Sequence, residues 1–162
     1  MKKIVVATSG ASGVNLAQKF INYLPKEYEC HFIKTKNAEV VNVKEGSNVV
    51  FHSESNIAAS IASGSFGVDM MAVIPTSMNT LAKISCAIAD NLVCRAASVM
   101  IKERKTLLLA PREMPFSPID LENMHKLSHL GVIIAPPIMG YYAKIDSLEA
   151  MEDFLIGKWF DQ

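Results

Sequence analysis

The sequence contains little that would suggest a disulfide-stabilised, metal-binding or membrane-spanning protein. Its three cysteines, Cys30, Cys86 and Cys94, are an odd number without C-x-x-C spacing, which argues against a disulfide framework and a structural zinc site. We expect all three to act as small apolar side chains. No hydrophobic run approaches membrane-spanning length, and the first residues lack the pattern of a secretion signal. We therefore expect a cytoplasmic protein with no metal site.

An excess of charge of one sign is also absent. Sixteen Lys and Arg residues balance sixteen Asp and Glu residues, so no overall basic field would attract nucleic acid or an anionic membrane. Half of the 162 residues are hydrophobic. That length and composition predict a single domain over residues 1–162, with a sizeable core and either an apolar surface or a large interface.

The first strand and the loop after it are the most informative stretch. Ile4, Val5 and Val6 form a short β-branched run, and the loop TSGASG at 8–13 then leads into a helical pattern. Backbone N–H groups at such a helix start bind phosphate readily. Gly10 and Gly13 lie three residues apart with no lysine following, which matches neither a P-loop nor a dinucleotide fingerprint. A tight turn without a ligand explains the loop equally well.

Strands and helices alternate along the whole chain. Strands are expected near residues 3, 30, 69, 106 and 131, with a possible short edge segment at 49–52. This alternation predicts a three-layer α/β/α domain with a mostly parallel, Rossmann-like sheet. Helices are expected at 14–24, from Lys36 to about Glu45, at 81–88, 92–102, 121–130 and 147–160. The last should present Leu148, Met151, Phe154 and Leu155 on one face.

Polar side chains follow several of the predicted strands. Thr35 ends the second strand, where open α/β sheets bind ligands, although it could equally cap the next helix. Arg112 and Glu113 follow a buried strand and stand between two prolines, which favours a functional role. We interpret His52, a lone histidine in this stretch of the sequence, as a surface residue. The loop at 75–80 offers Ser77, Asn79 and Thr80, of which helix capping needs only one.

At this point the sequence resembles the flavin prenyltransferases of the UbiX type, which share a flavodoxin-like superfamily with the flavin-binding cysteine decarboxylases. The matching segments run in order along nearly the whole chain. They are TSGASG at 8–13, IASGS at 61–65, P-x-S-x-x-T at 75–80, RAA-x-V-x-x-KER at 95–104, PRE-x-P at 111–115, and PP-x-x-x-Y-Y followed by S-L-E at 136–149. The last three together are specific.

The resemblance implies a homo-oligomer, a dodecamer, that binds FMN and adds a dimethylallyl group to it without a metal. The donor would be dimethylallyl phosphate, and the prenylated FMN would serve a UbiD-type decarboxylase. The residues implied to hold FMN are Gly10, Ala11, Ser12, Thr35, Ser77, Met78, Asn79, Thr80 and Arg112. Tyr142 and Lys158 are implied to bind dimethylallyl phosphate, with Lys102 and Glu113 nearby and Glu45 close to the reacting flavin.

The residue types suit this chemistry. Breaking an allylic C–O bond releases phosphate, whose charge Lys102, Arg112 and Lys158 would stabilise while the flavin N5 takes the allyl carbon. Closing the ring on C6 requires proton transfer, for which Ser12, Glu45 and the released phosphate are the candidates. Glu113 could give a proton to the departing phosphate or orient Arg112.

Two positions depart from the family pattern. Thr35 replaces the usual serine and keeps the hydroxyl, whereas Lys158 replaces a common arginine and loses its two-pronged donor geometry.

Three other functions stay open. One is an FMN-dependent decarboxylase of cysteine-containing substrates, although Pro136–Gly140 lacks the Asn of that group's Pro-x-Met-Asn segment. The second is a flavin-binding subunit without chemistry of its own, and the third is an aromatic-acid decarboxylase.

Overall fold

The computed structural model describes residues 1–10, 13–35 and 47–162. The helix expected from Lys36 to Glu45 lies outside the described residues. The strands are β1 (Lys2–Ala7), β2 (Tyr28–Lys34), β3 (Val49–Ser53), β4 (Met70–Thr76), β5 (Thr106–Pro111) and β6 (Ile133–Ile134). The helices are α1 (Val14–Asn22), α2 (Met78–Ser85), α3 (Leu92–Lys102), α4 (Pro118–His129) and α5 (Leu148–Phe160), with 3-10 turns η1 (Ser60–Ala62), η2 (Gly64–Phe66) and η3 (Tyr141–Ala143).

The six strands form one parallel sheet in the order β3-β2-β1-β4-β5-β6. The expected three-layer fold is confirmed, and the segment at 49–52 is indeed an edge strand. The chain builds outward from β1 to β3 on one side and from β4 to β6 on the other. The order in which the chain adds strands therefore reverses between β1 and β4. Ligands of open α/β sheets bind outside the carboxyl ends of the strands at such a point.

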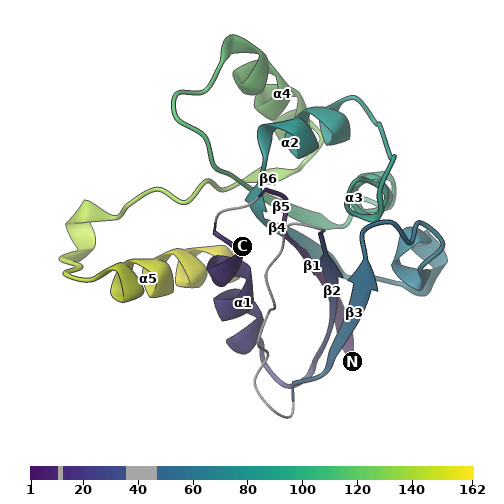
Figure 1. The fold of residues 1–162 in the computed structure, drawn as a ribbon, viewed down its shortest axis with the longest axis horizontal. Coiled ribbons are helices and arrows are strands. Elements are labelled where there is room, and N and C mark those ends of the chain that lie inside the picture. The colour runs from purple at the N-terminus through teal and green to yellow at the C-terminus, as the bar shows by residue number, and fades with distance from the viewer. Residues whose placement is uncertain (11–12, 36–46) are drawn as a thin grey trace.

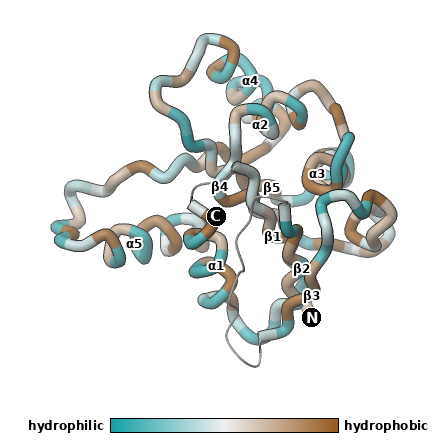
Figure 2. The backbone as a smooth tube through the Cα atoms, in the orientation of Figure 1, coloured by the Kyte–Doolittle hydropathy of each residue, from teal (hydrophilic) through white to brown (hydrophobic). Residues whose placement is uncertain are grey.

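The sheet separates two hydrophobic cores. Neighbouring β1 residues face opposite sides, so Val5 packs with α2, α3 and α4 whereas Val6 packs with α1 and α5. Figure 1 shows these two groups of helices on opposite faces of the sheet. In Figure 2 hydrophobic residues predominate along the central strands, as expected where both faces are covered.

Three sequence expectations about side-chain exposure are wrong. Cys86 is exposed, because α2 ends at Ser85 and the chain then turns outward. Ile88, expected on the apolar face of that helix with Leu81 and Ile84, lies beyond the helix end and is 49% exposed. Leu148, expected on the buried face of the last helix, is 77% exposed because it opens α5 at the far end from the sheet. The residues of α5 that are buried are Leu155, Ile156 and Trp159.

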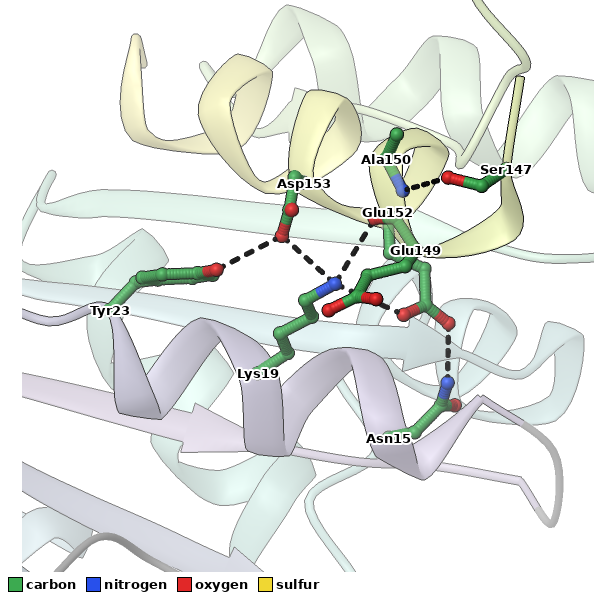
Figure 3. A network of polar contacts seen from close by, with 8 residues as sticks. All are labelled: Asn15, Lys19, Tyr23, Ser147, Glu149, Ala150, Glu152 and Asp153. Carbon is green, nitrogen blue, oxygen red and sulfur yellow. Dashed lines mark hydrogen bonds and ion pairs between the residues drawn. The ribbon is translucent and has the colours of Figure 1, made fainter. Parts of the chain in front are cut away.

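A polar network joins α5 to α1 (Figure 3). The Lys19 ammonium of α1 lies 2.9 Å from an Asp153 carboxylate oxygen and 3.4 Å from one of Glu152. Asp153 also accepts a hydrogen bond from the Tyr23 hydroxyl at 3.1 Å, and Glu152 accepts one from the Asn15 amide. Ser147 caps α5 by accepting the Ala150 N–H. Each of these groups has a partner, so the network fixes how α5 sits on α1.

Residues 136–147, here called the arm, connect β6 to α5 and extend away from the sheet before the chain turns back (Figure 1). The arm exposes large apolar side chains to a degree that is unusual for a monomeric surface. They are Ile138, Met139, Tyr141 and Tyr142, each between 54% and 80% exposed. Among the described helices, none is both long and apolar enough to cross a membrane.

Candidate functional site

The loops after β1 and β4 meet at the point between these two strands where the strand order reverses. The Ser9 N–H donates to the Pro75 carbonyl at 3.0 Å, and the Ser77 N–H donates to the Ser9 hydroxyl oxygen at 2.9 Å. These two bonds hold the start of α2 against the loop that leads into α1. The sequence expectation began the site at Gly10 and missed Ser9, which its place directly after a central parallel strand could have indicated.

Glycine is required on both sides of the β1 to α1 turn. Gly10 and Gly13 have φ angles of 104° and 93°, which side chains of L-residues rarely adopt. A Cβ on Gly13 would also approach the Pro75 ring to 3.3 Å. Gly13 is the N-cap of α1 and offers no capping side chain. This helix start therefore lacks the competing side-chain oxygen that would occupy an anion's place.

Two buried hydroxyls at the carboxyl ends of the strands have no partner among the described residues. Thr8 follows β1 and is 0% exposed, and Thr35 follows β2 and is 8% exposed; neither Oγ1 makes a hydrogen bond. Thr76 at the end of β4 differs, because its Oγ1 donates to the Val73 carbonyl and accepts the Ala110 N–H. A buried hydroxyl without a partner costs free energy, so Thr8 and Thr35 fit a bound polar ligand.

The start of α2 uses some of its polar groups and leaves others for a ligand. Ser77 caps the helix by accepting the Thr80 N–H at 3.3 Å, and its hydroxyl also donates to the Thr80 hydroxyl at 3.1 Å. Asn79 is exposed, and its amide makes no hydrogen bond within the described part of the chain. Met78 is half-buried between them. Of the residues at this helix start that the sequence predicts to bind a ligand, Asn79 has the most accessible side chain.

Arg112 and Glu113 stand at the carboxyl end of β5, as the sequence predicts. The Arg112 N–H donates to the Thr76 carbonyl at 3.2 Å, which fixes this turn against β4. A Glu113 carboxylate oxygen accepts the Met114 N–H at 3.0 Å. Both side chains line a cavity of about 670 Å³ whose opposite wall is Pro136–Met139, the first part of the arm.

Tyr142 and Lys158 come together although they lie on the arm and on α5. The Tyr142 ring packs edge-on against the Phe154 ring at 5.7 Å between centroids, and the Lys158 ammonium lies 5.9 Å from that same ring. Both residues line a cavity of about 370 Å³. Gly140 permits this arrangement, because a Cβ there would overlap the Phe154 ring. A phenol side chain and a lysine side chain therefore line one small space, and the Lys158 ammonium also lies 4.0 Å from an Asp161 carboxylate oxygen.

Lys102 does not join these residues within the chain. It ends α3, before the amino end of β5, whereas Arg112 follows the carboxyl end of the same strand. The strand between them spans about 16 Å at roughly 3.3 Å per residue. Lys102 pairs with Glu103 at 2.8 Å and its side chain is 67% exposed. Glu103 in turn packs against Gly64. Ala11, Ser12 and Glu45 lie outside the described residues, so their predicted roles stay predictions.

Other candidate nucleophiles and ligands are accounted for. Burial raises the pKa of Cys30 to about 12 and that of Cys94 to about 11, so neither is a ready thiolate. Over residues 1–10, 13–35 and 47–162, no three His, Cys, Asp or Glu side chains are grouped to hold a metal ion. The interpretation of His52 as a surface residue is wrong: it is half-buried and bonded to His31.

Comparison with known proteins identifies the family. The sequence matches the Flavoprotein family over residues 1–159. A flavin prenyltransferase UbiX from Helicobacter pylori is 51% identical over 172 residues, covering 98% of this chain and 91% of that protein. The chain therefore belongs to the flavoproteins and, among them, to the flavin prenyltransferases of the UbiX type, as the sequence motifs predict.

Two solved structures agree with this placement. One is described as a dodecameric FMN-dependent UbiX-like decarboxylase from Escherichia coli O157:H7, with a TM-score of 0.92 and 37% identity over 99% of this chain and 92% of that one. The other is AnUbiX (PadA1) in complex with FMN and dimethylallyl pyrophosphate, with a TM-score of 0.90 and 38% identity over 99% of this chain and 90% of that one. The flavodoxin-like fold class is confirmed.

Proposed function

We propose that this chain binds reduced FMN at the carboxyl edge of the sheet and transfers to its N5 and C6 a dimethylallyl group from dimethylallyl phosphate. The observation that supports this most is the pair of buried hydroxyls, Thr8 and Thr35, that have no partner among the described residues where β1 and β2 end. Both lie at the carboxyl edge of the sheet, where Asn79 at the start of α2 and Arg112 directly after β5 also stand.

In this proposal FMN is held by Gly10, Ala11, Ser12, Thr35, Ser77, Met78, Asn79, Thr80 and Arg112. Reduced FMN supplies the electron-rich ring atoms to which the allyl carbon bonds. The chain's own task is to bind and orient the donor. Arg112 stabilises the phosphate charge that grows as the C–O bond breaks, and Glu113 beside it exchanges a proton with the phosphate. Ser12 and Glu45 are proposed to move the proton that ring closure requires.

Tyr142 and Lys158 are proposed to bind the donor phosphate. A phenol hydroxyl and an ammonium that share one cavity can each donate to a phosphate oxygen. Lys158 acts there as a point charge, without the two parallel donors of an arginine. The bound molecule in AnUbiX, dimethylallyl pyrophosphate, shares this allyl phosphoester chemistry.

The position of Lys102 supports a site shared between copies. Because Lys102 cannot reach the residues at the carboxyl edge of its own sheet, we propose that it enters the site of a neighbouring copy. Ser63 and Ser65, small and exposed, lie with Gly64 beside Glu103 and allow a close approach there. The exposed apolar arm would then be covered in a homo-oligomer, and the Escherichia coli relative is described as dodecameric. Native mass spectrometry tests this: a dodecamer is expected, and a predominant monomer would contradict it.

We further propose that the prenylated FMN passes to a UbiD-type decarboxylase and that the protein works in the cytoplasm. The family membership supports the first. Three unpaired cysteines, one of them exposed, support a reducing compartment.

The function is tested by anaerobic incubation of the full chain with reduced FMN and dimethylallyl phosphate, followed by mass spectrometry of the flavin. A flavin heavier by one five-carbon unit is expected. Lys158→Ala should lower kcat/KM by about tenfold or more, because a charge-assisted bond to phosphate is lost. Lys126→Ala, at an exposed lysine of α4, is the matched control and should retain full activity. Tightly bound but unmodified FMN would overturn the proposal.

A further inference from the structure

A hydrogen-bonded chain of three side chains lies on β2 and the edge strand β3, apart from the residues discussed so far. His31, in the middle of β2, is 3% exposed. Its Nδ1 lies 2.9 Å from the His52 Nε2 of β3, and its Nε2 lies 3.0 Å from a Glu29 carboxylate oxygen. Both ring nitrogens of His31 are therefore occupied, one on each side. We call Glu29, His31 and His52 the histidine tie.

The two histidines of the tie can take up one proton while their hydrogen bonds stay intact, but they cannot take up two. With both rings neutral, the His31 Nε2–H donates to Glu29 and its bare Nδ1 accepts from His52. When His31 takes a proton, both of its nitrogens donate, and His52 can still accept through the other tautomer. A second proton on His52 leaves two N–H groups facing each other at the 2.9 Å contact. The His31 to His52 bond must then open.

The surroundings disfavour that second charge. Burial, together with the charge of His31, lowers the pKa of His52 below its ordinary value. Burial also lowers the pKa of His31, although Glu29 opposes this and Lys3 of β1 adds to it. The Phe66 ring of η2 meets His31 edge-on at 5.2 Å and is itself covered by the Lys3 ammonium at 4.2 Å.

The histidine tie connects directly to the proposed flavin site. His52 pairs in register with Ile33 of β2, and Ser53 pairs with Lys34, the residue before Thr35. His52 and Thr35 line one cavity of about 310 Å³ together with Lys34, Phe51 and Ser53. Within the described sheet β3 pairs only with β2. The edge strand therefore depends on this ladder, on Phe51 against Phe32 on one face and on His52 against His31 on the other.

We propose that Glu29, His31 and His52 act as a proton-sensitive tie that positions β3 beside Thr35, so that FMN binding weakens when a second proton enters the tie. His52 is a positioning residue in this proposal and acts through β3 and the cavity wall. The proposal rests on the proposed function, because it assumes that FMN occupies the carboxyl edge next to Thr35.

The test is the dissociation constant of FMN, measured by quenching of flavin fluorescence between pH 7.5 and 4.5. His52→Gln is the informative variant, because its amide can donate to His31 Nδ1 and cannot take up a proton. His125→Gln, at an exposed histidine of α4, is the matched control. The wild type and His125→Gln should lose about fivefold in affinity over this range through linkage, and His52→Gln less than about twofold. Comparing variants cancels the titration of the FMN phosphate itself.

Parallel pH profiles in all three proteins would overturn the proposal. A second readout keeps it testable apart from the proposed function: the thermal midpoint of the flavin-free protein over the same pH range. Acidification should lower the midpoint of the wild type and His125→Gln more than that of His52→Gln, and equal losses would contradict the tie. Failure of all three proteins to bind FMN at pH 7.5 would instead overturn the proposed function, with the melting profiles still deciding the tie.

Discussion

Helix α1 takes part in two polar regions that are built on opposite principles. Along its side, Lys19 and Tyr23 meet the acidic residues of α5, and each group has a partner. Where β1, the strand before it, and β2 end, the hydroxyls of Thr8 and Thr35 are buried without a partner in the part of the chain that the structure describes. Matched polar groups fix the position of an element, whereas unmatched ones lower stability and are kept where a ligand completes them. The first region should therefore govern stability and the second binding.

The largest effect is expected at the apolar centre of the α1–α5 side. Trp159 is 5% exposed, and its Nε1–H donates to the Ala135 carbonyl at 2.9 Å. Trp159→Ala should lower the free energy of unfolding by about 3–5 kcal/mol through cavity formation. Trp159→Phe keeps most of the packing and should cost about 1 kcal/mol for the lost bond. Urea denaturation at fixed protein concentration measures both. If folded Trp159→Phe lost FMN affinity without losing stability, the assignment of stability to this region and binding to the other would be refuted.

A pair of identical substitutions sharpens the comparison next. Thr76→Val removes a hydroxyl that makes two hydrogen bonds and leaves the buried Ala110 N–H without a partner, so the free energy of unfolding should fall by about 2 kcal/mol. Thr35→Val removes a hydroxyl that makes no hydrogen bond to the described residues, so stability should hold or rise. FMN affinity should instead fall about tenfold, since a bond of about 1.4 kcal/mol is lost. Urea denaturation and flavin titration of both variants test these expectations. Equal destabilisation by Thr76→Val and Thr35→Val would refute the distinction between matched and unmatched hydroxyls.

The smallest effect is expected at the ion pairs between α1 and α5, whose side chains are 16–45% exposed. Lys19→Met should lower the thermal midpoint by about 1–2 °C, because such pairs are screened by water. The hydrogen bond from Lys19 lowers the pKa of Asp153 below its ordinary 3.8. This contribution is present above pH 3.8 and is lost as the pH falls through the lower folded value. The midpoints of wild type and variant should therefore converge in acid, while FMN affinity stays equal at pH 7. A difference that persists in strong acid would assign the effect to packing.

The sequence was sufficient for the architecture because the physical signals were local and periodic. The β-branched run at Ile4–Val6 and the helix ahead of Pro25 each follow from side-chain pattern alone. The family resemblance rested on motifs spread along the chain, and the comparisons bear it out. The position of Arg112 at the carboxyl edge of the sheet also followed from the sequence, because all strands of a parallel sheet have their carboxyl ends at that one edge.

What the sequence did not reveal were contacts between distant elements. His31 and His52 lie 21 residues apart and meet only because β2 and β3 pair in a particular register. Lys102 and Arg112 are far apart because Lys102 precedes the amino end of β5 and Arg112 follows its carboxyl end. The exposure of Leu148 depends on the arm, whose path away from the sheet no hydrophobic pattern encodes. Thr8 differs from Thr76 only in what surrounds each hydroxyl.

The division of the core by the sheet has a consequence for engineering this protein. Val5 and Val6 are adjacent in the chain, yet they belong to clusters that share no buried side chain. Side chains on opposite faces of a sheet lack common packing partners, and substitutions without shared partners have additive effects on stability. Each half of the interior can therefore be redesigned as a separate problem. Stabilising changes found on the α3 side should combine with those found on the α1 side without being selected again together.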